Sequence, residues 1–452
     1  MIASLKEYLE GKRILILGFG IEGRSSYNFL RKLLPKAELH IADQNNEHEV
    51  LRTLKDPFTK ITSGKDYLEK INNFDLIFKS PGIKSDLIIG KTDAEISCQT
   101  DLFLRFYKDQ IIGITGTKGK STTSSLIAHI VKSSGCSCEL IGNIGTPPFD
   151  VIDKIDKETI IVYEMSSHML ESVNDSPHIA IFLNIFPEHL DHYSDFEAYR
   201  SAKDRIWKFQ NDSDFLIVNE SLVHELESSR SKLCLFGNDK SKDHFGNVEN
   251  GTVYLNNDNS FNAFLSNDDK FNLIGEHNLL NILAAFKACS LIGLTNPEIL
   301  NGIKSFTTLE HRLEYIGKFR NIHFYNDSIA TVPEACIAAL DAIKDIDTLI
   351  LGGKDRGLDY KILIERINNS EINNIILMGE VGKRLTKEFN EIDKRSIYAN
   401  TLEEAFKSIW QYTETGKSCL LSPAASSYDQ FRNFEERGNM FKKIARTQSD
   451  PC

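Results

Sequence analysis

The segment from Ile111 to Thr123, IIGITGTKGKSTT, holds the residues of this chain whose types and spacing point most clearly to chemistry. A short apolar run ends in glycines and continues into a helix-compatible stretch, which is the layout of a phosphate-binding loop. Gly116 and Gly119 let successive backbone N–H groups turn toward a phosphate. Lys120 adds positive charge, and the Ser121 hydroxyl is suited to ligate Mg²⁺. The commonest form of this loop has a further glycine where this chain has isoleucine, so the segment predicts a variant loop.

Two other apolar runs end in residues that can bind a metal. Glu164 directly follows TIIVY, where a carboxylate would share Mg²⁺ with Ser121. A solvated strand end is the alternative interpretation of Glu164. His189 follows IAIFLNI among polar neighbours, a setting that favours a metal ligand or a base over a core histidine. The sequence YRSAKDRIW predicts that Lys203 is an exposed lysine on a helix. Its spacing from the other candidate residues predicts no functional role.

A second glycine-rich turn lies near the start of the chain. Gly18, Gly20 and Gly23 form GxGxxG after the run RILILGF, and Asp43 ends the next strand about 20 residues further on. This pattern is typical of a nicotinamide-binding Rossmann site, yet any diphosphate would suit the same turn, including that of a sugar nucleotide. The turn SPGI at 80–83 follows another strand and favours the second interpretation, since it would reach a ligand at the same sheet edge.

The elements that must position these residues alternate along the chain. Apolar strand-like runs such as AELHIAD and DTLILGG alternate with amphipathic helical stretches, which predicts an α/β protein with mostly parallel sheets. The rhythm recurs in three sets, so we expect a Rossmann-like domain over 1–107, a central P-loop ATPase-like domain over 108–309 and a C-terminal Rossmann-like domain over 310–452. Between residues 211 and 272 the chain is polar with short β-prone pieces, which predicts a strand-rich insertion in the central domain.

Length and composition agree with a multidomain enzyme. The chain has 452 residues and a formal net charge of −11, which argues against a nucleic-acid partner. Its eight cysteines show no zinc-site spacing, so reduced thiols and a cytoplasmic location are expected. No signal peptide opens the chain, and no apolar run approaches the roughly 20 residues that span a bilayer. We therefore expect a soluble protein that does not associate with membranes.

Considered together, the motifs resemble those of the Mur ligases of peptidoglycan synthesis. The resemblance covers essentially the whole chain and rests on GITGTKGKST, EMSS, NIFPEHLDHY, YRSAKDRI, GEHNLLNILAA, EHRLE, YNDS and LSPAASSYDQFRNFEERGNMF. The last segment is most similar to the members that add glutamate. In those members the N-terminal Rossmann-like domain holds UDP, so the resemblance implies a sugar-nucleotide site and no hydride chemistry.

The resemblance also implies residue roles. The catalytic residues would be Lys120, His189 and Lys203, with Lys203 carbamylated. Two Mg²⁺ ions would be held by Ser121, Glu164, His189 and Lys203. ATP would contact Gly116, Thr117, Lys118, Gly119, Lys120, Ser121, Thr122, Asn278, Asn281, Arg312 and Asp327. The sugar nucleotide would contact Ile21, Glu22, Asp43, Gln44, Ser80, Gly82, Asn143 and Ser166, while glutamate would contact Thr331, Arg356, Ser427 and Phe434.

The implied reaction joins D-glutamate to UDP-N-acetylmuramoyl-L-alanine in the cytoplasm, in a monomeric enzyme. ATP would convert the alanyl carboxylate to an acyl phosphate, and the amine of glutamate would displace phosphate through a tetrahedral intermediate. Two departures from the family pattern concern the substrate sites. Ile329 stands where the family usually has lysine, so Lys354 or Arg356 would have to replace that cation, and His168-Met169 stands where Phe-Gln is common.

Two other classes of protein stay open at this point. A nicotinamide-dependent oxidoreductase would use the turn at Gly18 and Asp43 but would leave the phosphate-binding loop without a purpose. A nucleotide-binding regulatory or scaffold protein of ligase ancestry is the second alternative, because Ile329 removes a family cation. Within the ligases, the alanine-adding and tripeptide-forming members are the nearest competitors, although they lack the ending DQFRNFEERG.

Overall fold

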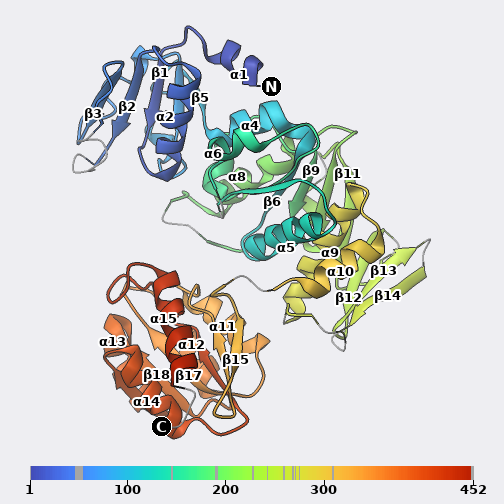
Figure 1. The fold of residues 1–452 in the computed structure, drawn as a ribbon, viewed down its shortest axis with the longest axis vertical. Helices are drawn as coiled ribbons and strands as arrows, with labels where there is room; N and C mark the ends of the chain where they lie inside the picture. The colour runs from blue at the N-terminus through green and yellow to red at the C-terminus, as the bar shows by residue number, and fades with distance from the viewer. Residues whose placement is uncertain are drawn as a thin grey trace. The chain divides into compact units, whose positions relative to one another are not determined.

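The computed structural model describes residues 2–45, 54–143, 146–188, 192–226, 229–241, 243–257, 260–266, 269, 271–273, 275–307 and 310–448. The chain forms two compact units, residues 1–271 with 277–306 and residues 272–276 with 307–452. The described strands form three sheets, two in the first unit and one in the second (Figure 1). The sequence prediction of an α/β protein with mostly parallel sheets is confirmed, whereas the three domain boundaries stay a prediction.

The first sheet is wholly parallel, with strand order β3-β2-β1-β4-β5. Residues of β1 alternate between two apolar layers, because successive side chains of a strand point to opposite faces. Ile14 and Ile16 pack with helices α1 and α2, while Leu15 and Leu17 pack with Tyr67 and its neighbours on the other face. The elements are β1 (Ile14–Leu17), β2 (Leu39–Asp43), β3 (Thr59–Ser63), β4 (Leu76–Lys79), β5 (Glu95–Ser97), α1 (Ile2–Leu9), α2 (Ile21–Leu33), α4 (Gln99–Tyr107), and the 3₁₀ turns Ile71–Asn73, Ser85–Leu87 and Lys108–Gln110.

The second sheet has the order β14-β13-β12-β11-β10-β9-β6-β8-β7. Its strands are β6 (Ile111–Thr115), β7 (Cys138–Gly142), β8 (Ile160–Glu164), β9 (Ile179–Phe182), β10 (Phe215–Asn219), β11 (Lys232–Gly237), β12 (His244–Glu249), β13 (Thr252–Asn257) and β14 (Ser260–Ser266). Its helices are α5 (Lys120–Ser133), α6 (Pro148–Val151), α7 (Ser167–Leu170), α8 (Phe196–Lys208), α9 (Glu276–Leu291) and α10 (Asn296–Ser305), with 3₁₀ turns at Ile152–Lys154 and Glu220–Glu225.

The polar region between residues 211 and 272 is strand-rich, as predicted, but it extends the second sheet. Strands β10 and β11 continue the parallel pairing, and β12 to β14 close the sheet as an antiparallel meander. The predicted strand-rich character of this region is therefore confirmed, and its strands are part of the second sheet. The backbone hydrogen bonds of these strands are satisfied by joining the existing sheet edge, which a polar composition does not reveal.

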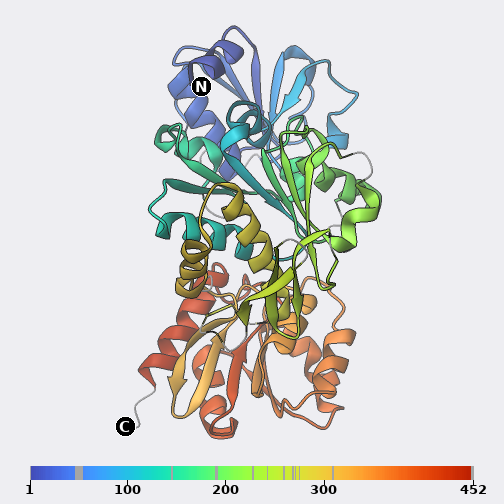
Figure 2. The ribbon, with the colours of Figure 1, turned by 90° about the vertical axis from the view of Figure 1, so that its right-hand side faces the viewer.

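The C-terminal unit holds the third sheet, of order β15-β16-β20-β17-β18-β19 and parallel except for β15. Figure 2 shows its helices on both faces of the sheet. Leu349 and Leu351 of β17 face α11, α12 and α13, while Ile350 between them faces α14 and α15. The elements are β15 (Glu314–Phe319), β16 (Ile322–Asn326), β17 (Ile346–Gly352), β18 (Asn374–Met378), β19 (Arg395–Ala399), β20 (Ser418–Leu421), α11 (Pro333–Ala342), α12 (Lys361–Asn368), α13 (Gly379–Asn390), α14 (Leu402–Tyr412) and α15 (Phe434–Thr447).

None of the helices in the described part of the chain is long and apolar enough to cross a lipid bilayer.

Candidate active site

The predicted phosphate-binding loop joins strand β6 to helix α5. Strand β6 lies between β8 and β9 in the sheet. The next two strands of the chain, β7 and β8, lie on one side of β6, and β9 and β10 lie on the other. The loop after β6 is therefore at the point where the strand order reverses, which is where open α/β sheets bind ligands. Gly119 has a φ of +85°, and a Cβ atom there would lie 2.5 Å from the Asn281 side-chain oxygen. Glycine is therefore required both by backbone conformation and by space. Helix α5 begins directly after this glycine and directs its N-terminus toward the loop.

Lys120 lies back over the loop that precedes it. Its Nζ donates to the carbonyl oxygens of Gly116 and Thr117 at 2.8 and 2.9 Å. Thr117 is fixed in turn, because its N–H donates to the carbonyl of Asn184 and its hydroxyl lies 3.0 Å from the Tyr199 hydroxyl. Lys118 is exposed and pairs with Glu188 at 2.9 Å, and Thr122 is buried in α5. The loop thus holds one inward lysine and one outward lysine.

Glu164 is fully buried at the end of β8, so the alternative of a solvated strand end is wrong. Its carboxylate lies 3.3 Å from the hydroxyls of both Ser121 and Ser124 and accepts from the Asn143 amide at 2.8 Å. Glu164 forms no ion pair with any of the described residues. A buried carboxylate with only neutral donors is costly, and a bound cation would compensate it. One carboxylate beside a serine hydroxyl is a donor set that suits Mg²⁺ bound together with phosphates.

Lys203 lies on α8 and is only 1 % exposed, so the interpretation as an exposed helix lysine is wrong. Its Nζ donates to the Gly116 carbonyl at 2.8 Å and lies 3.4 Å from the Thr115 hydroxyl. Burial, together with the positive charge of Lys120, lowers the pKa of Lys203 well below its usual value, although Glu188 and Glu164 oppose this shift. The amine is therefore biased toward its neutral, nucleophilic form. His189 lies outside the described residues, and its predicted role stays a prediction.

The structure brings the predicted adenine residues to the same loop. Asn278 and Asn281 are buried on α9 and are joined by a hydrogen bond of 3.0 Å, and the Asn281 amide stands against Gly119. A helix more than 150 residues from the loop in sequence thus forms part of its wall.

The first glycine-rich turn gathers a second group of predicted residues. Strand β1 lies between β2 and β4, so the turns after β1 and β4 face one crevice. Asp43 accepts from the Phe19 N–H at 2.6 Å, and the Ser80 hydroxyl donates to the Gly18 carbonyl at 2.8 Å. Ile21, Gln44 and Gly82 are exposed around this turn. Glu22 is half-buried, and burial raises its pKa to about 7 against the opposing charge of Lys79.

Two residues predicted to contact the sugar nucleotide lie near the phosphate-binding loop instead of the first turn. Asn143 follows β7 and donates to Glu164, as described above. Ser166 precedes α7, where its hydroxyl accepts from the Met169 N–H at 3.3 Å. Both follow strands of the second sheet at its carboxyl edge, the same edge as the phosphate-binding loop.

In the C-terminal unit, the predicted glutamate residues lie on loops at the carboxyl ends of parallel strands and at the start of α15. The Ser328 hydroxyl donates to the Phe434 carbonyl at 2.8 Å, and the Lys354 N–H donates to the Ser426 carbonyl at 2.7 Å, so three loops are tied together. Ser427 is buried and Thr331 is half-buried. Arg356 is exposed and forms no ion pair with a described residue, whereas Lys354 pairs with Glu380 at 2.7 Å.

The residues predicted for the nucleotide in this unit surround Asp327. Its carboxylate accepts from the Ser422 hydroxyl at 2.8 Å and from the Leu313 N–H at 3.2 Å, next to Arg312 in the chain. Burial raises the pKa of Asp327 to about 7, against the opposing effects of Ser422 and Arg312. His311 precedes Arg312 with a φ of +66°, which is strained for a residue with a side chain.

Sequence reasoning missed several residues of these sites. Ser124 shares the α5 face of Ser121, a spacing of i, i+3 that could have identified it. Asn184 and Thr115 follow or end strands at the loop, and only the sheet order brings them there. Arg437 is buried and donates to the carbonyls of Ser328, Gly352 and Ala425, a role that no local pattern signals.

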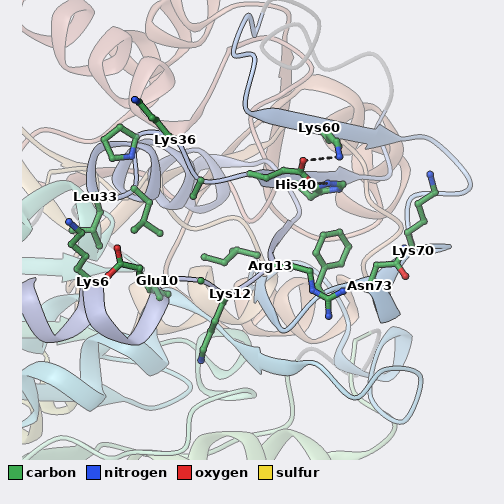
Figure 3. Close-up of a pocket in the computed structure, with 18 residues that line it drawn as sticks. Lys6, Glu10, Lys12, Arg13, Leu33, Lys36, His40, Lys60, Lys70 and Asn73 are labelled. Atoms are coloured by element: carbon green, nitrogen blue, oxygen red, sulfur yellow. Dashed lines mark hydrogen bonds and ion pairs between the residues drawn. The ribbon is translucent and has the colours of Figure 1, made fainter.

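One cavity of the first unit is lined by none of the predicted residues. It measures about 930 Å³ and lies at the amino ends of β1, β2 and β3, the edge opposite to the glycine-rich turn. Figure 3 shows its rim of mostly basic side chains, with Lys6, Lys12, Lys36, Lys60 and Lys70 among them. This cavity is therefore not part of the candidate active site.

This combination of three α/β sheets, a phosphate-binding loop and a buried glutamate beside it defines a nucleotide-dependent enzyme. Residues 114–289 match the model of the Mur ligase middle domain, and residues 311–425 match that of the Mur ligase glutamate ligase domain. The chain belongs to the Mur ligase family. It is accordingly an enzyme of the ATP-dependent ligases that form amide bonds, and it acts in the ligation of peptidoglycan precursors. The family uses ATP and Mg²⁺.

Individual relatives agree over nearly the full length. The chain is 33 % identical to the UDP-N-acetylmuramoylalanine--D-glutamate ligase of Thermoanaerobacter sp. (strain X514), covering 96 % of this chain and 98 % of the relative. It is also 33 % identical to the ligase of the same name from Clostridium tetani, with 98 % of both chains covered. Among solved structures, MurF ligase from Thermotoga maritima in complex with ADP has a TM-score of 0.60 at 17 % identity, over 96 % of this chain and 95 % of that one. This structural likeness supports the fold.

Proposed function

We propose that this enzyme joins D-glutamate to UDP-N-acetylmuramoyl-L-alanine and converts ATP to ADP and phosphate. The names of the relatives that match over nearly the whole chain support this substrate pair. The observation that carries the proposal is the arrangement around one loop, where Lys120, Ser121, Glu164 and Lys203 converge within hydrogen-bond distances of the loop or of one another.

The proposed metal sites follow from the donors near this loop. Ser121 and Glu164 would hold one Mg²⁺, and His189 with a carbamylated Lys203 would hold a second. When bound, these ions would offset the charge of the phosphates that react. The buried carboxylate of Glu164, which forms no ion pair with a described residue, fits the first ion.

Carbamylation of Lys203 is supported by the burial of its amine. The neutral amine nitrogen would form a bond to the carbon of CO₂ and lose a proton, which turns a cationic side chain into an anionic one. The low pKa of Lys203 favours the neutral amine that this step requires. The change would also replace the repulsion between Lys120 and Lys203 by attraction, so the modified residue fits its surroundings better than the ammonium ion.

The proposed chemistry proceeds in two steps. A carboxylate oxygen of the alanyl group would attack the γ-phosphorus of ATP, form an acyl phosphate and release ADP. The amine of glutamate would then attack the carbonyl carbon, lose a proton and expel phosphate from a tetrahedral intermediate. Lys120 and the backbone N–H groups of the loop would stabilise the charge on the transferred phosphoryl group. Asn278 and Asn281 would bind adenine, with Arg312 and Asp327 serving the phosphate and the ribose.

The substrate sites divide between the two units. Ile21, Glu22, Asp43, Gln44, Ser80 and Gly82 would contact the UDP portion, and Asn143 and Ser166 the muramoyl-alanine portion. Thr331, Ser427 and Phe434 would position glutamate. Because Ile329 replaces the family lysine and Glu380 already pairs with Lys354, Arg356 is the cation that would bind a glutamate carboxylate.

Phosphate release tests the proposal. Purified enzyme is mixed with ATP, Mg²⁺, UDP-N-acetylmuramoyl-L-alanine and one amino acid at a time, including D-glutamate, L-glutamate and L-alanine. The proposal expects turnover with D-glutamate alone. Equal turnover with L-glutamate would contradict the stereochemistry, and no turnover with any amino acid would contradict the proposed reaction.

A further inference from the structure

A buried lysine lies directly before the turn that we propose for the sugar nucleotide. Lys79 ends strand β4, and its side chain is only 1 % exposed. Its ammonium donates to the Ile83 carbonyl at 2.8 Å and lies 3.4 Å from a carboxylate oxygen of Glu171. A buried ammonium is costly unless it is paired and hydrogen-bonded, so both partners are needed to keep it there.

Glu171 directly follows helix α7, which packs with the second sheet. Its carboxylate accepts from the Ser85 hydroxyl at 2.7 Å and lies 2.6 Å from the His192 Nε2. Burial acts to raise the pKa of Glu171, but Lys79, Ser85 and His192 together outweigh it, so the pKa is lowered and the carboxylate is ionised. Glu171 is therefore a carboxylate that contacts Lys79 and Ser85 from the segment of the first sheet and His192 from the segment of the second sheet.

The departure at His168 belongs to the same network. The rings of His168 and His192 meet edge to face with centroids 4.2 Å apart, so His168 supports the histidine that contacts Glu171. Where the family commonly has phenylalanine, this chain thus places a second imidazole against the histidine that contacts Glu171.

The turn at 80–83 is held from two sides. The Ser80 hydroxyl donates to the Gly18 carbonyl, and the Ile83 N–H donates to the Ser80 carbonyl at 3.1 Å. On its other side, the Ile83 carbonyl receives Lys79. Removal of the ammonium would free that carbonyl and would break the link that Lys79 makes between the turn and Glu171. The Ser85 hydroxyl, two residues beyond the turn, would still donate to Glu171.

We infer that Lys79 is a positioning residue for the sugar-nucleotide acceptor. Paired with Glu171, it fixes the turn at 80–83 relative to the cap of α7 at Ser166, and these two segments supply the proposed contacts to the acceptor. The inference rests on the proposed function, since it assigns that acceptor to these segments. Loss of one hydrogen bond to a charged group changes an equilibrium constant by roughly 10- to 100-fold.

Binding measurements on separate ligands test the inference. Calorimetry is used to titrate UDP-N-acetylmuramoyl-L-alanine and, separately, ADP into the wild type and into the variants Lys79→Met, Glu171→Gln, the double variant, Lys79→Arg and Lys91→Met. Lys91 is an exposed lysine of the same unit and serves as the matched control. We expect the Kd for the acceptor to rise about 10- to 100-fold in Lys79→Met and in Glu171→Gln and no further in the double variant, because the two residues act as a pair, while Lys91→Met binds the acceptor like the wild type.

Three further results complete the expectation. The Kd for ADP stays unchanged, Lys79→Arg retains most of the acceptor affinity, and in turnover assays the KM for the acceptor rises while kcat changes little. Equal acceptor binding by the wild type and Lys79→Met would overturn the inference and leave the proposed function intact. A parallel loss of ADP binding would reveal a general structural role and would also overturn it. Failure of the wild type to bind the acceptor would instead refute the proposed function, and the inference with it.

Discussion

Lys120 and Lys203 donate to the same carbonyl oxygen, that of Gly116, each at 2.8 Å. Two ammonium ions that share one acceptor repel each other, and burial of Lys203 makes this repulsion stronger than it would be in water. A neutral or modified Lys203 relieves it. This relationship is the structural basis for the proposed carbamate.

Lys203→Ala should lower kcat by at least about 10³-fold, because the variant lacks the amine that would be carbamylated. A short carboxylic acid added to the assay should restore part of the activity by supplying the missing carboxylate. Lys208→Ala, at the exposed end of the same helix, is the control and should retain full activity. Full activity in Lys203→Ala would refute the carbamate assignment.

Lys120→Ala should reduce phosphate release by at least about 10²-fold, since the positive charge directed at the loop would be lost from the transition state. Lys118→Ala is the matched control in the same loop, because Lys118 points outward to Glu188. Its effect should be within a few-fold of the wild type. Equal losses in the two variants would contradict the inward and outward roles of these lysines.

Gly119→Ala should weaken ADP binding by at least about 10-fold. Both the positive φ and the approach of Asn281 oppose a side chain at this position, so the loop would have to move. Gly135 has nearly the same φ, +82°, but nothing lies within 4 Å of an added Cβ atom. Gly135→Ala should therefore cost only about 1 kcal/mol of stability and leave ADP binding intact. Calorimetric titration with ADP distinguishes the two.

Arg356→Gln should raise the KM for D-glutamate about 10- to 100-fold, the expected loss for one charge-assisted hydrogen bond. Lys354→Gln should change this KM less, because Glu380 already holds that lysine. Initial rates at varied D-glutamate concentrations measure both. A larger effect in Lys354→Gln would assign the replacement of the family lysine to position 354.

Asp327→Asn should flatten the pH dependence of stability between about pH 4 and pH 7. Burial raises the folded pKa to about 7, above the unfolded value of about 3.9. The contribution of this group is therefore complete below pH 4 and is lost as the pH rises through 7, by up to about 4 kcal/mol. Asparagine has no proton to lose. The measurement is thermal unfolding of both proteins from pH 4 to pH 8. We expect the stability of Asp327→Asn relative to the wild type to increase as the pH rises. A stability difference that does not change with pH would contradict the assignment.

The sequence predicts the parts of this molecule that depend on local pattern. The strand, glycine loop and helix around Lys120 were expected from the apolar run and the glycines, and the structure confirms them. The turn at 80–83 was expected beside the first glycine-rich turn, and the Ser80 hydroxyl does reach Gly18. Both predictions succeed because parallel strands place their carboxyl ends at one edge.

Residues whose role depends on distant packing could not be predicted in this way. The sequence around Lys203 predicts an exposed helix lysine. In the structure, however, its amine is buried against Gly116 of the phosphate-binding loop, 87 residues earlier in the chain. Only the family resemblance pointed to it. Lys79 and Glu171, 92 residues apart, lack even that signal, because their pairing depends on how two sheets of one unit meet. That these charged side chains are buried can be recognised only from the folded structure, in which the sheets are packed together.

The central claim is that ATP activates the acceptor carboxylate as an acyl phosphate. Its most direct test uses UDP-N-acetylmuramoyl-L-alanine with ¹⁸O in the alanyl carboxylate, incubated with ATP, Mg²⁺ and D-glutamate, followed by mass spectrometry of the released phosphate. Transfer of one labelled oxygen to each phosphate is the predicted result, because the bridging oxygen leaves with phosphorus when the amine attacks. Unlabelled phosphate, with amide product formed, would contradict the account.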